Sequence, residues 1–285
     1  MSEWPTAPLP QSSVTAMIRS VMECVINVSV GKQFQIIDAL SERCARSLLD
    51  VHTDRDYDRS VFTLAGPHVF ADSQGLAQGA LELVDFRGYT GIHPALGALD
   101  VVPFVPLADE PFAEAVHLRD RFGAWLARTC AVPVFVYDDE TPLPVVRKGA
   151  FVTIEPTWGP PTVDPRIGAA CVGSRGLLVA LNINIQASLS RAQLIARTMR
   201  SSQVRTLALV AGDRVQVSMN LIEPLTFTPL MAIAQVATMV TLDSVELVGL
   251  LPEAVVVGHE DEYVAVGIDP LATIETRLRR QIAHP

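Results

Sequence analysis

The chain has 285 residues, of which 49% are hydrophobic and 19% are charged, and its formal net charge at pH 7 is −9. This composition indicates a globular protein with one large core or two smaller ones, and no apolar run reaches the roughly 20 residues of a membrane-spanning helix. The acidic charge, without a long basic block, argues against a nucleic-acid-binding surface. The cysteines stand far apart at positions 24, 44, 130 and 171, which predicts free thiols and no metal site.

The N-terminal half begins with a segment that we expect to lie outside the fold. Residues 1–21 are rich in proline and serine and predict a flexible extension. They lack the basic start and apolar block of a secretory signal, so we expect a cytoplasmic protein. The patterns that follow predict strands at 23–30, 47–53, 59–66, 98–107 and 132–138, and helices at 33–49, 68–87 and 111–130. Pro103 and Pro106 favour a sheet edge or a strand end for the run 98–107.

Residues 138–168 interrupt this alternation of strands and helices. They are rich in proline and glycine and have no sustained period, which predicts a long functional loop or a crossing between domains. The patterns then predict strands at 176–185 and 244–252, a hairpin at 204–222 that turns at 211–213, and helices at 190–202, 228–242 and 269–282. Asp269 is expected to cap the last helix, with Pro270 in its first turn.

The order of these elements predicts the fold class. Two halves that each combine strands with amphipathic helices indicate an α/β (α+β) fold with two subdomains, residues 22–176 and 177–285. Because hairpins stand beside helical crossovers, we expect each subdomain to be a mixed β-sheet with helices on one face.

The stretch 89–100, YTGIHPALGALD, contains the best candidate for chemistry, His93. No glycine-rich phosphate loop and no G-x-S-x-G nucleophile motif occurs in the chain. Gly91 and Gly97 permit a close approach of ligand to backbone, Pro94 stiffens the loop, and an imidazole titrates near neutral pH, as a general acid–base requires. On these residues alone, packing in a turn explains His93 as well as catalysis does.

Blocks of sequence in both halves resemble the formiminotransferase domain of the glutamate formimidoyltransferase family, in that family's order. The resemblance covers roughly residues 22–255. It is carried by ECVINVSVGK, LLDVHTDRDYDRSVFTLAG, GIHPALGALDVVPFVPL and VPVFVYD in the first half, and by GSRGLLVALNINI, RVQVSMNL and VELVGLLPEA in the second. We expect no counterpart of the helical cyclodeaminase domain that is fused to this one in animals.

The resemblance implies two α/β subdomains whose sheets face each other across a substrate tunnel, in a homodimer. It implies a folate-binding transferase of one-carbon metabolism and histidine catabolism, which moves a formimino group from N-formimino-L-glutamate to N5 of its co-substrate tetrahydrofolate without a metal. His93 matches the family's catalytic histidine. The residues that match its folate-contacting segment are Gly159, Pro160, Pro161, Thr162, Val163, Asp164, Pro165, Arg166, Ile167 and Gly168.

Other polar and aromatic residues are candidates for holding the substrates. Those expected to contact the substrate are Asn27, His52, Arg59 and Arg175. Four cations are candidates for binding the carboxylates of folate or glutamate, and ordinary solvated cations are at least as good an interpretation of each: Arg147, Lys148, Arg166 and Arg175. Trp158 and Ile167 are expected to form a flat apolar slot for the pterin ring.

The sequence also departs from the family at places that are usually charged. Neutral residues occupy these places here, namely Val30, Thr90, Ile92 and Ala95. His52 and Asp58 stand at two further altered places. They could form a polar pair that compensates for the lost charges, and an ordinary position at a sheet edge is an equally good interpretation of His52. Two hypotheses therefore stand beside formimino transfer: a divergent transferase with a different one-carbon or amidine donor or acceptor, and a non-catalytic protein that binds folate or a partner.

Overall fold

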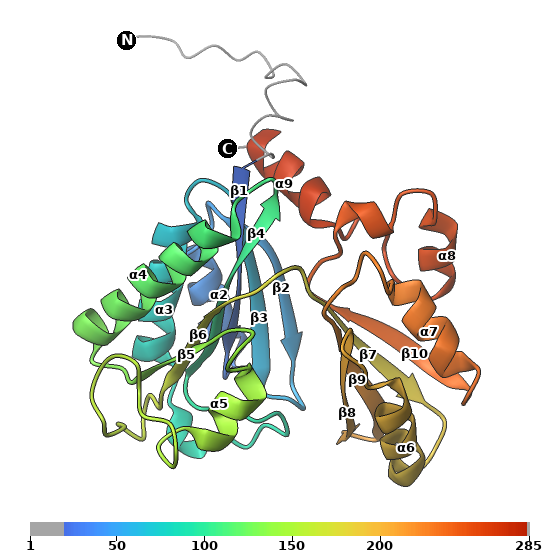
Figure 1. Cartoon of the computed structure of the whole chain (residues 1–285), viewed down its shortest axis with the longest axis horizontal. Coiled ribbons are helices and arrows are strands. Elements are labelled where there is room, and N and C mark those ends of the chain that lie inside the picture. Colours follow the sequence, from blue (N-terminus) through green and yellow to red (C-terminus); the bar gives the residue numbers. More distant parts are fainter. Residues whose placement is uncertain (1–19, 284–285) are drawn as a thin grey trace.

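The computed structural model describes residues 20–283, which form two β-sheets that face each other with most helices on their outer sides (Figure 1). The α/β fold with two sheets is therefore as predicted, whereas the expected extension 1–21 lies almost wholly outside the described residues. All four cysteines are free thiols, as predicted. None of the helices in the described part of the chain is long and apolar enough to cross a membrane.

The N-terminal sheet has six strands in the order β2-β3-β1-β4-β6-β5 and is mixed, because β6 is parallel to both of its neighbours. The strands are β1 Ser20–Val28, β2 Leu48–Asp54, β3 Arg59–Ala65, β4 Leu99–Ala108, β5 Val134–Tyr137 and β6 Ala170–Ser174. The helices of this half are α2 Phe34–Glu42, α3 Val69–Leu83, α4 Phe112–Cys130 and α5 Leu143–Gly149, with a 3-10 turn at Phe86–Gly88.

The C-terminal sheet has four strands in the order β10-β7-β9-β8. These strands are β7 Val179–Ile185, β8 Val204–Ala211, β9 Arg214–Leu221 and β10 Leu242–Val248. The helices are α6 Leu189–Met199, α7 Pro229–Ala237, α8 Glu260–Ala265 and α9 Ile274–Ala283. Every neighbouring pair is antiparallel, so the expectation of a mixed sheet is wrong for this half. The connections through α6 and α7 are nevertheless parallel crossovers, each of which skips one strand: β9 lies between the parallel strands β7 and β8, and β7 lies between the parallel strands β9 and β10.

Alternation of side chains along the strands gives each sheet two unlike faces. In β1, Cys24, Ile26 and Val28 are fully buried in the core beneath α2, α3 and α4. Val25 and Asn27 point to the opposite face, which is turned toward the C-terminal sheet. The C-terminal sheet follows the same rule, with its own apolar cluster beneath α6 and α7. Polar side chains of the two sheets therefore face one another.

The C-terminal helix α9 joins the two halves. Its Ile274 and Leu278 are buried against Val21, Leu49 and Ala65 of the N-terminal sheet, although α9 follows the C-terminal sheet in the chain. This contact covers one end of the sheet face that looks toward the other half. The division at 176/177 stays a prediction, since α9 packs against the half that precedes that boundary.

Strand β4 is central, between β1 and β6, so the expectation of an edge position for its prolines is wrong. A proline has no backbone N–H, so within a sheet it removes one hydrogen-bond donor from the pairing of two strands. Pro106 lies beyond residues 101–104, the stretch of β4 that pairs with β6, so no ladder on that side is interrupted there. Most of the strand is buried, and burial of its apolar side chains outweighs the hydrogen bond lost at Pro103.

The segment 138–168 connects β5 to β6 within one sheet, so it is not a crossing between the subdomains. It contains the short helix α5, which the sequence pattern did not reveal because seven residues are too few to show a helical period. Val146 of α5 is fully buried against Phe135 and Tyr137 of β5. The chain passes between the sheets in the shorter segment 175–178.

Helix α9 begins directly after Thr273, so the predicted cap at Asp269 is wrong. Asp269 and Pro270 precede the helix, and the Asp269 carboxylate accepts a hydrogen bond from the Leu271 amide in a separate turn. Thr273 takes the capping role, because its Oγ1 accepts a hydrogen bond of 3.2 Å from the amide of Thr276. Helix α8 was also missed by the sequence pattern.

The loop that carries His93 is anchored to β6 by a close contact of two backbones. The Ala98 amide donates to the Ile167 carbonyl at 2.8 Å, and the Ala169 amide donates to the Leu96 carbonyl at 2.9 Å. Gly97 lies between these bonds, where a Cβ atom would be 2.5 Å from the carbonyl oxygens of both Ile167 and Ala169. Only glycine fits at this contact without a backbone shift.

We therefore expect Gly97→Ala to lower the free energy of unfolding by about 3 kcal/mol, because the added methyl group must push the two backbones apart. Chemical denaturation measures this loss. Gly176→Ala is the matched control, since a Cβ atom there meets nothing within 4 Å. Equal stability of the two variants would contradict the close contact.

Candidate active site

A cleft lies between the polar faces of the two sheets, and His93 is on its wall. The cleft holds about 1170 Å³ of space that protein atoms do not fill, part of it open to solvent. Four arginines line it, namely Arg59, Arg147, Arg175 and Arg205. Only two carboxylates are among the lining residues, Glu23 and Asp54. The cleft therefore carries an excess of positive charge in a chain whose net charge is −9, which suits anionic ligands.

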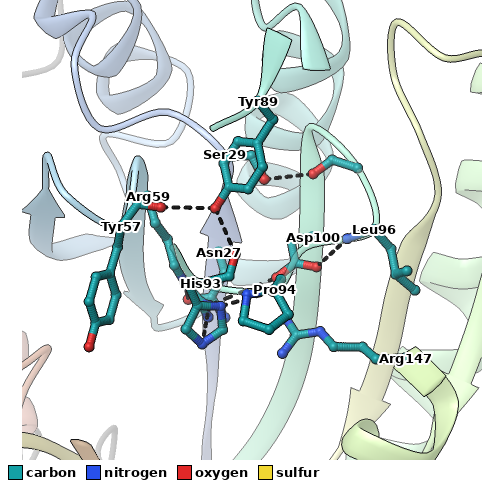
Figure 2. Close-up of polar contacts among 11 residues, drawn as sticks. Asn27, Ser29, Tyr57, Arg59, Tyr89, His93, Pro94, Leu96, Asp100 and Arg147 are labelled. Atoms are coloured by element: carbon teal, nitrogen blue, oxygen red, sulfur yellow. Dashed lines mark hydrogen bonds and ion pairs between the residues drawn. The ribbon is translucent and has the colours of Figure 1, made fainter. Parts of the chain in front are cut away.

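His93 stands in the loop before β4, and its imidazole is in direct contact with Arg59 of β3 (Figure 2). The guanidinium Nη1 of Arg59 lies 2.6 Å from Nδ1 and 3.0 Å from Nε2 of the ring. The Pro94 carbonyl oxygen is 2.9 Å from Nδ1 and can only accept, which favours the tautomer with the proton on Nδ1. Because the in-plane lone-pair directions of Nδ1 and Nε2 diverge, a single Nη1 atom this close to both nitrogens lies over the face of the ring.

Asp100 holds the groups around His93 in place. Its side chain is almost fully buried, and its Oδ1 accepts a hydrogen bond of 3.0 Å from the Leu96 amide in the histidine loop. Its Oδ2 forms an ion pair with Nη2 of Arg147 and lies 3.9 Å from Nη1 of Arg59. A single carboxylate thus fixes the loop and partly neutralises two cations of the site.

A β-bulge turns Asp100 toward two of the arginines that line the cleft. Strand alternation would send this residue into the core with its even-numbered neighbours, but the ladder between β1 and β4 shifts here. Asn27 is opposite Val101 and Val28 is opposite Leu99, so Asp100 has no partner across the ladder. A bulge of this kind bends the strand and re-aims a side chain, which explains how Asp100 reaches the two arginines.

Two tyrosines connect the histidine loop to the C-terminal sheet. Oη of Tyr89 lies 2.9 Å from the Tyr57 carbonyl and 3.0 Å from the His93 carbonyl, so this hydroxyl bridges the loop and the β2–β3 turn. Oη of Tyr57 donates to Oε1 of the fully buried Gln216 in β9 at 2.5 Å. These contacts close the cleft at the β2–β3 turn. The two halves of the fold therefore share one polar network with His93.

Burial and charge keep His93 neutral. Burial, and then the nearby Arg59 and Arg147, lower the pKa of His93 to about 2, against a smaller opposing effect of the Pro94 carbonyl. Burial also raises the pKa of both Tyr57 and Tyr89 to about 12. At neutral pH the imidazole is therefore uncharged, in contrast to the expected titration near neutral pH, and both phenols stay protonated.

Glu23 is a buried carboxyl at the end of the cleft that α9 covers. It is only 4% exposed, and burial raises its pKa to about 7, with Glu275 of α9 adding to the rise and Arg175 opposing it. Because of this balance, Glu23 changes its charge near neutral pH, in contrast to the permanently charged arginines of the cleft.

The structure places the four predicted substrate contacts in the same cleft as His93. Asn27 and Arg59 lie beside each other, with Nε of Arg59 3.3 Å from Oδ1 of Asn27. His52 lines the cleft from β2, and its Nε2 is 3.5 Å from Oε1 of Glu246 in the facing sheet. Arg175 lines the end near Glu23.

The suggested pair of His52 and Asp58 is not formed. His52 faces Glu246, whereas Asp58 accepts a hydrogen bond of 2.9 Å from the Gly31 amide and lies 3.3 Å from Nζ of Lys32. Asp58 therefore shapes the glycine turn after β1, and its carboxylate does not line the cleft.

The predicted folate segment, Gly159 to Gly168, lies outside the cleft lining. Its middle is exposed, and Arg166 binds the Leu81 carbonyl at the end of α3 at 2.8 Å. Only its C-terminal end approaches the histidine loop, where Gly168 pairs with Gly97 in an isolated bridge. The role of this segment stays a prediction.

The slot expected from Trp158 and Ile167 is not formed beside His93. The Trp158 ring covers Gly123 of α4, and both residues pack against the N-terminal core on the side of the helices. Among the basic candidates, Arg147 lines the cleft, whereas Arg166 is held at α3 and Lys148 is not part of the cleft lining.

The sequence did not single out Asp100, Tyr57, Tyr89 or Glu23 as site residues. Asp100 ends the stretch that contains His93, but alternation alone assigns it to the core, and a bulge leaves no signal in one sequence. Glu23 carries a weak signal, because it is a charged residue in an otherwise apolar strand. The tyrosines lie in turns, where residue type alone predicts no partner.

Comparisons with known proteins agree with this arrangement. The family model described as "Formiminotransferase domain, N-terminal subdomain" matches residues 21–175, more than half of the chain. The chain belongs to this family. A glutamate formimidoyltransferase of Streptococcus pyogenes serotype M1 is 32% identical over 236 residues, which cover 71% of this chain and 77% of that protein.

Two further formiminotransferase relatives extend the likeness over more of the chain. A glutamate formimidoyltransferase of Thermoplasma acidophilum is 29% identical over 92% of this chain and 98% of its own length. A formimidoyltransferase-cyclodeaminase of Gallus gallus is 31% identical over 86% of this chain. The chain spans about half the length of that last relative, 52%.

The raised pKa of Glu23 makes the free energy of unfolding depend on pH. The carboxyl ionises near 4.5 in an unfolded chain and near 7 in the fold, so the folded state loses stability as pH rises through this window. Above pH 7 the buried charge costs about 3 kcal/mol. Glu23→Gln removes this cost, and we expect it to raise Tm at about pH 8 and to have little effect near pH 4.5.

Thermal unfolding at several pH values measures this difference. Glu155→Gln, in the exposed loop before β6, is the matched control and should leave Tm nearly unchanged at every pH. A gain in Tm for Glu23→Gln that does not vary with pH would contradict a titrating buried carboxyl.

Proposed function

We propose that the chain transfers a formimino group from N-formimino-L-glutamate to N5 of tetrahydrofolate, with His93 as the general acid–base. The observation that carries this proposal is a neutral imidazole, flanked by Arg59 and Arg147, in a cleft between the two sheets of a formiminotransferase-family chain. The two glutamate formimidoyltransferases among its relatives support the same reaction class.

The cleft suits both substrates by charge. Formiminoglutamate carries two carboxylates, and folate ends in a glutamate. Arginines bind carboxylates in two-pronged hydrogen bonds, and four of them line the cleft.

One imidazole is sufficient for the proton transfers. The N5 amine attacks the carbon of the protonated formimino group, a new C–N bond forms as the C=N π pair moves onto the formimino nitrogen, and His93 accepts the N5 proton. In the tetrahedral intermediate, His93 gives this proton to the glutamate nitrogen, the formimino nitrogen re-forms its double bond to carbon, and the bond between the glutamate nitrogen and that carbon breaks. The products are 5-formimidotetrahydrofolate and glutamate, and the imidazole returns to its neutral form.

The cleft arginines also favour an anionic donor over the neutral donors of the alternative hypothesis. Ile92 and Ala95 beside His93 are uncharged, but Arg59 and Arg147 approach the same imidazole from β3 and α5. Cations are therefore present at the site although the histidine loop itself lacks them. The folate contacts of residues 159–168 and the homodimer remain proposals.

Turnover of the purified protein with tetrahydrofolate and formiminoglutamate tests this function. We expect formation of the 5-formimido product, and we expect His93→Gln to lower kcat at least about 100-fold with little change in KM, because acid–base catalysis contributes on this scale. His117→Gln, exposed on the outer surface of α4, is the control and should keep the wild-type rate.

Calorimetry with tetrahydrofolate separates catalysis from binding alone. If the wild-type protein binds folate but forms no product, and His93→Gln binds with equal affinity, the protein is a folate binder. If product forms only with uncharged amidine donors, the donor assigned here is wrong.

A further inference from the structure

We propose that Glu23 anchors the pterin ring of tetrahydrofolate, and that its carboxylate accepts hydrogen bonds from the adjacent N3–H and 2-amino groups at one edge of that ring. This inference rests on the proposed function, because it names the residue that positions tetrahydrofolate for attack by N5. It also gives a role to a buried carboxyl group that the proton transfers at His93 do not use.

Glu23 is buried in the cleft without a partner. Its side chain is 4% exposed and lines the cleft from β1. Within residues 20–283 the carboxyl group forms no hydrogen bond and no ion pair. Arg175, which opposes the rise in the pKa of Glu23, instead donates through Nη1 to the Gly176 carbonyl at 2.9 Å. A buried polar group without a partner destabilises a fold, and a ligand with N–H donors supplies the partner that the fold lacks.

A second unpartnered polar side chain lies near Glu23 on the same face of the sheet. Thr63 of β3 is 1% exposed and lines the cleft, and its Oγ1 has no hydrogen-bond partner within the described residues. Thr63 pairs with Val25, which is two residues after Glu23 on β1, so the Cα atoms of Glu23 and Thr63 are roughly 7–8 Å apart. Two neighbouring strands thus present unsatisfied polar groups to the same part of the cleft.

An apolar platform separates Glu23 from the groups at His93. Val25 lies between Glu23 and Asn27 on the face of β1 that lines the cleft. The register of β1 and β4 puts Pro103 opposite Val25, and Pro103 lines the cleft as well. The apolar residues that line the cleft from the C-terminal half include Leu178, Ala180, Val248 and Leu250. A flat ring that lies between such surfaces keeps its polar edges free for side chains at its two ends.

The distance along β1 suits a pterin between Glu23 and His93. Strand residues rise about 3.3 Å each, so Glu23 and Asn27 are about 13 Å apart along β1. Arg59 connects Asn27 to His93, at 3.3 Å from Oδ1 of Asn27 and 2.6 Å from Nδ1 of His93 (Figure 2). In tetrahydrofolate, N5 belongs to one ring of the pterin, and N3 and the 2-amino group belong to the other. A pterin on the platform therefore turns its amino edge to Glu23 and N5 toward His93.

The same distance argues against the other substrate group that carries adjacent N–H donors. An ionised carboxylate only accepts hydrogen bonds, so its ligand must offer N–H or O–H groups. The protonated formimino group of the donor offers them, but its carbon must meet N5 beside His93, and Glu23 is about 13 Å from Asn27 along β1. The carboxylates of both substrates are repelled by Glu23. The amino edge of the pterin is the group that suits this place.

Binding of two ligands that differ only at this edge tests the anchor without turnover. The first is tetrahydrofolate, and the second is its 2-deamino-2-oxo analogue, in which a carbonyl oxygen replaces the 2-amino group. The analogue keeps N3–H but turns an acceptor toward Glu23. Calorimetry under anaerobic conditions gives the two dissociation constants, and their ratio is the preference of each variant.

We expect the wild-type protein to bind tetrahydrofolate at least about 100-fold more tightly than the analogue, because the analogue loses a charge-assisted hydrogen bond and sets two acceptors against each other. Glu23→Gln should reverse this preference, since the glutamine amide donates to the 2-oxo group and still accepts from N3–H. The variant should fold, because it replaces a buried charged group by a neutral one of the same shape.

Asp54→Asn is the matched control, because Asp54 is the other carboxylate that lines the cleft. Its Oδ1 already accepts hydrogen bonds from the amides of Asp56 at 2.7 Å and Tyr57 at 2.8 Å, and an asparagine keeps this acceptor. We expect Asp54→Asn to keep the wild-type preference for tetrahydrofolate.

Three results would overturn the proposal: wild-type affinities for the two ligands within about threefold of each other, a Glu23→Gln variant that keeps the wild-type preference, or an Asp54→Asn variant that reverses it as fully as Glu23→Gln. Failure of the proposed function looks different. In that case the preference for tetrahydrofolate depends on Glu23, while tetrahydrofolate and formiminoglutamate give no product. If product forms and the preference does not depend on Glu23, the function stands and the pterin anchor is wrong.

Discussion

The buried carboxylate of Asp100 is the constraint on which the candidate site depends. It binds the Leu96 amide of the histidine loop, pairs with Arg147 and lies near Arg59, so the loop and both cations keep fixed positions around one charge. Removing one partner of a buried ion pair destabilises the fold, because the remaining charge has neither water nor a counter-ion. The bulge in β4 is therefore the feature of the backbone that makes the site possible.

This arrangement explains how the chain can carry neutral residues beside its histidine. Ile92 and Ala95 contribute no charge, but cations reach the imidazole from a neighbouring strand and from α5. The network continues through Tyr89 and Tyr57 to Gln216 in the facing sheet. The charge that surrounds His93 is thus set by the tertiary structure, and the local sequence around the histidine is a poor guide to it.

Much of the fold follows from the sequence, because period-2 and period-3.6 patterns report directly which face of an element is buried. They identified the strands of both sheets and placed Asn27, Arg59 and His52 on strands that face the cleft. What they missed depends on contacts between distant segments. The central place of β4, the short helix α5, the true start of α9 and the inward turn of Asp100 are each decided by partners far away in the chain.

We place the proposed transfer of the formimino group in the cleft between the two sheets. A crystal structure of the protein with a stable N5-substituted tetrahydrofolate tests it most directly. We expect the pterin to lie in the cleft with N5 about 3 Å from a ring nitrogen of His93. A folate bound outside the cleft, over residues 159–168 with its pterin away from His93, would contradict it.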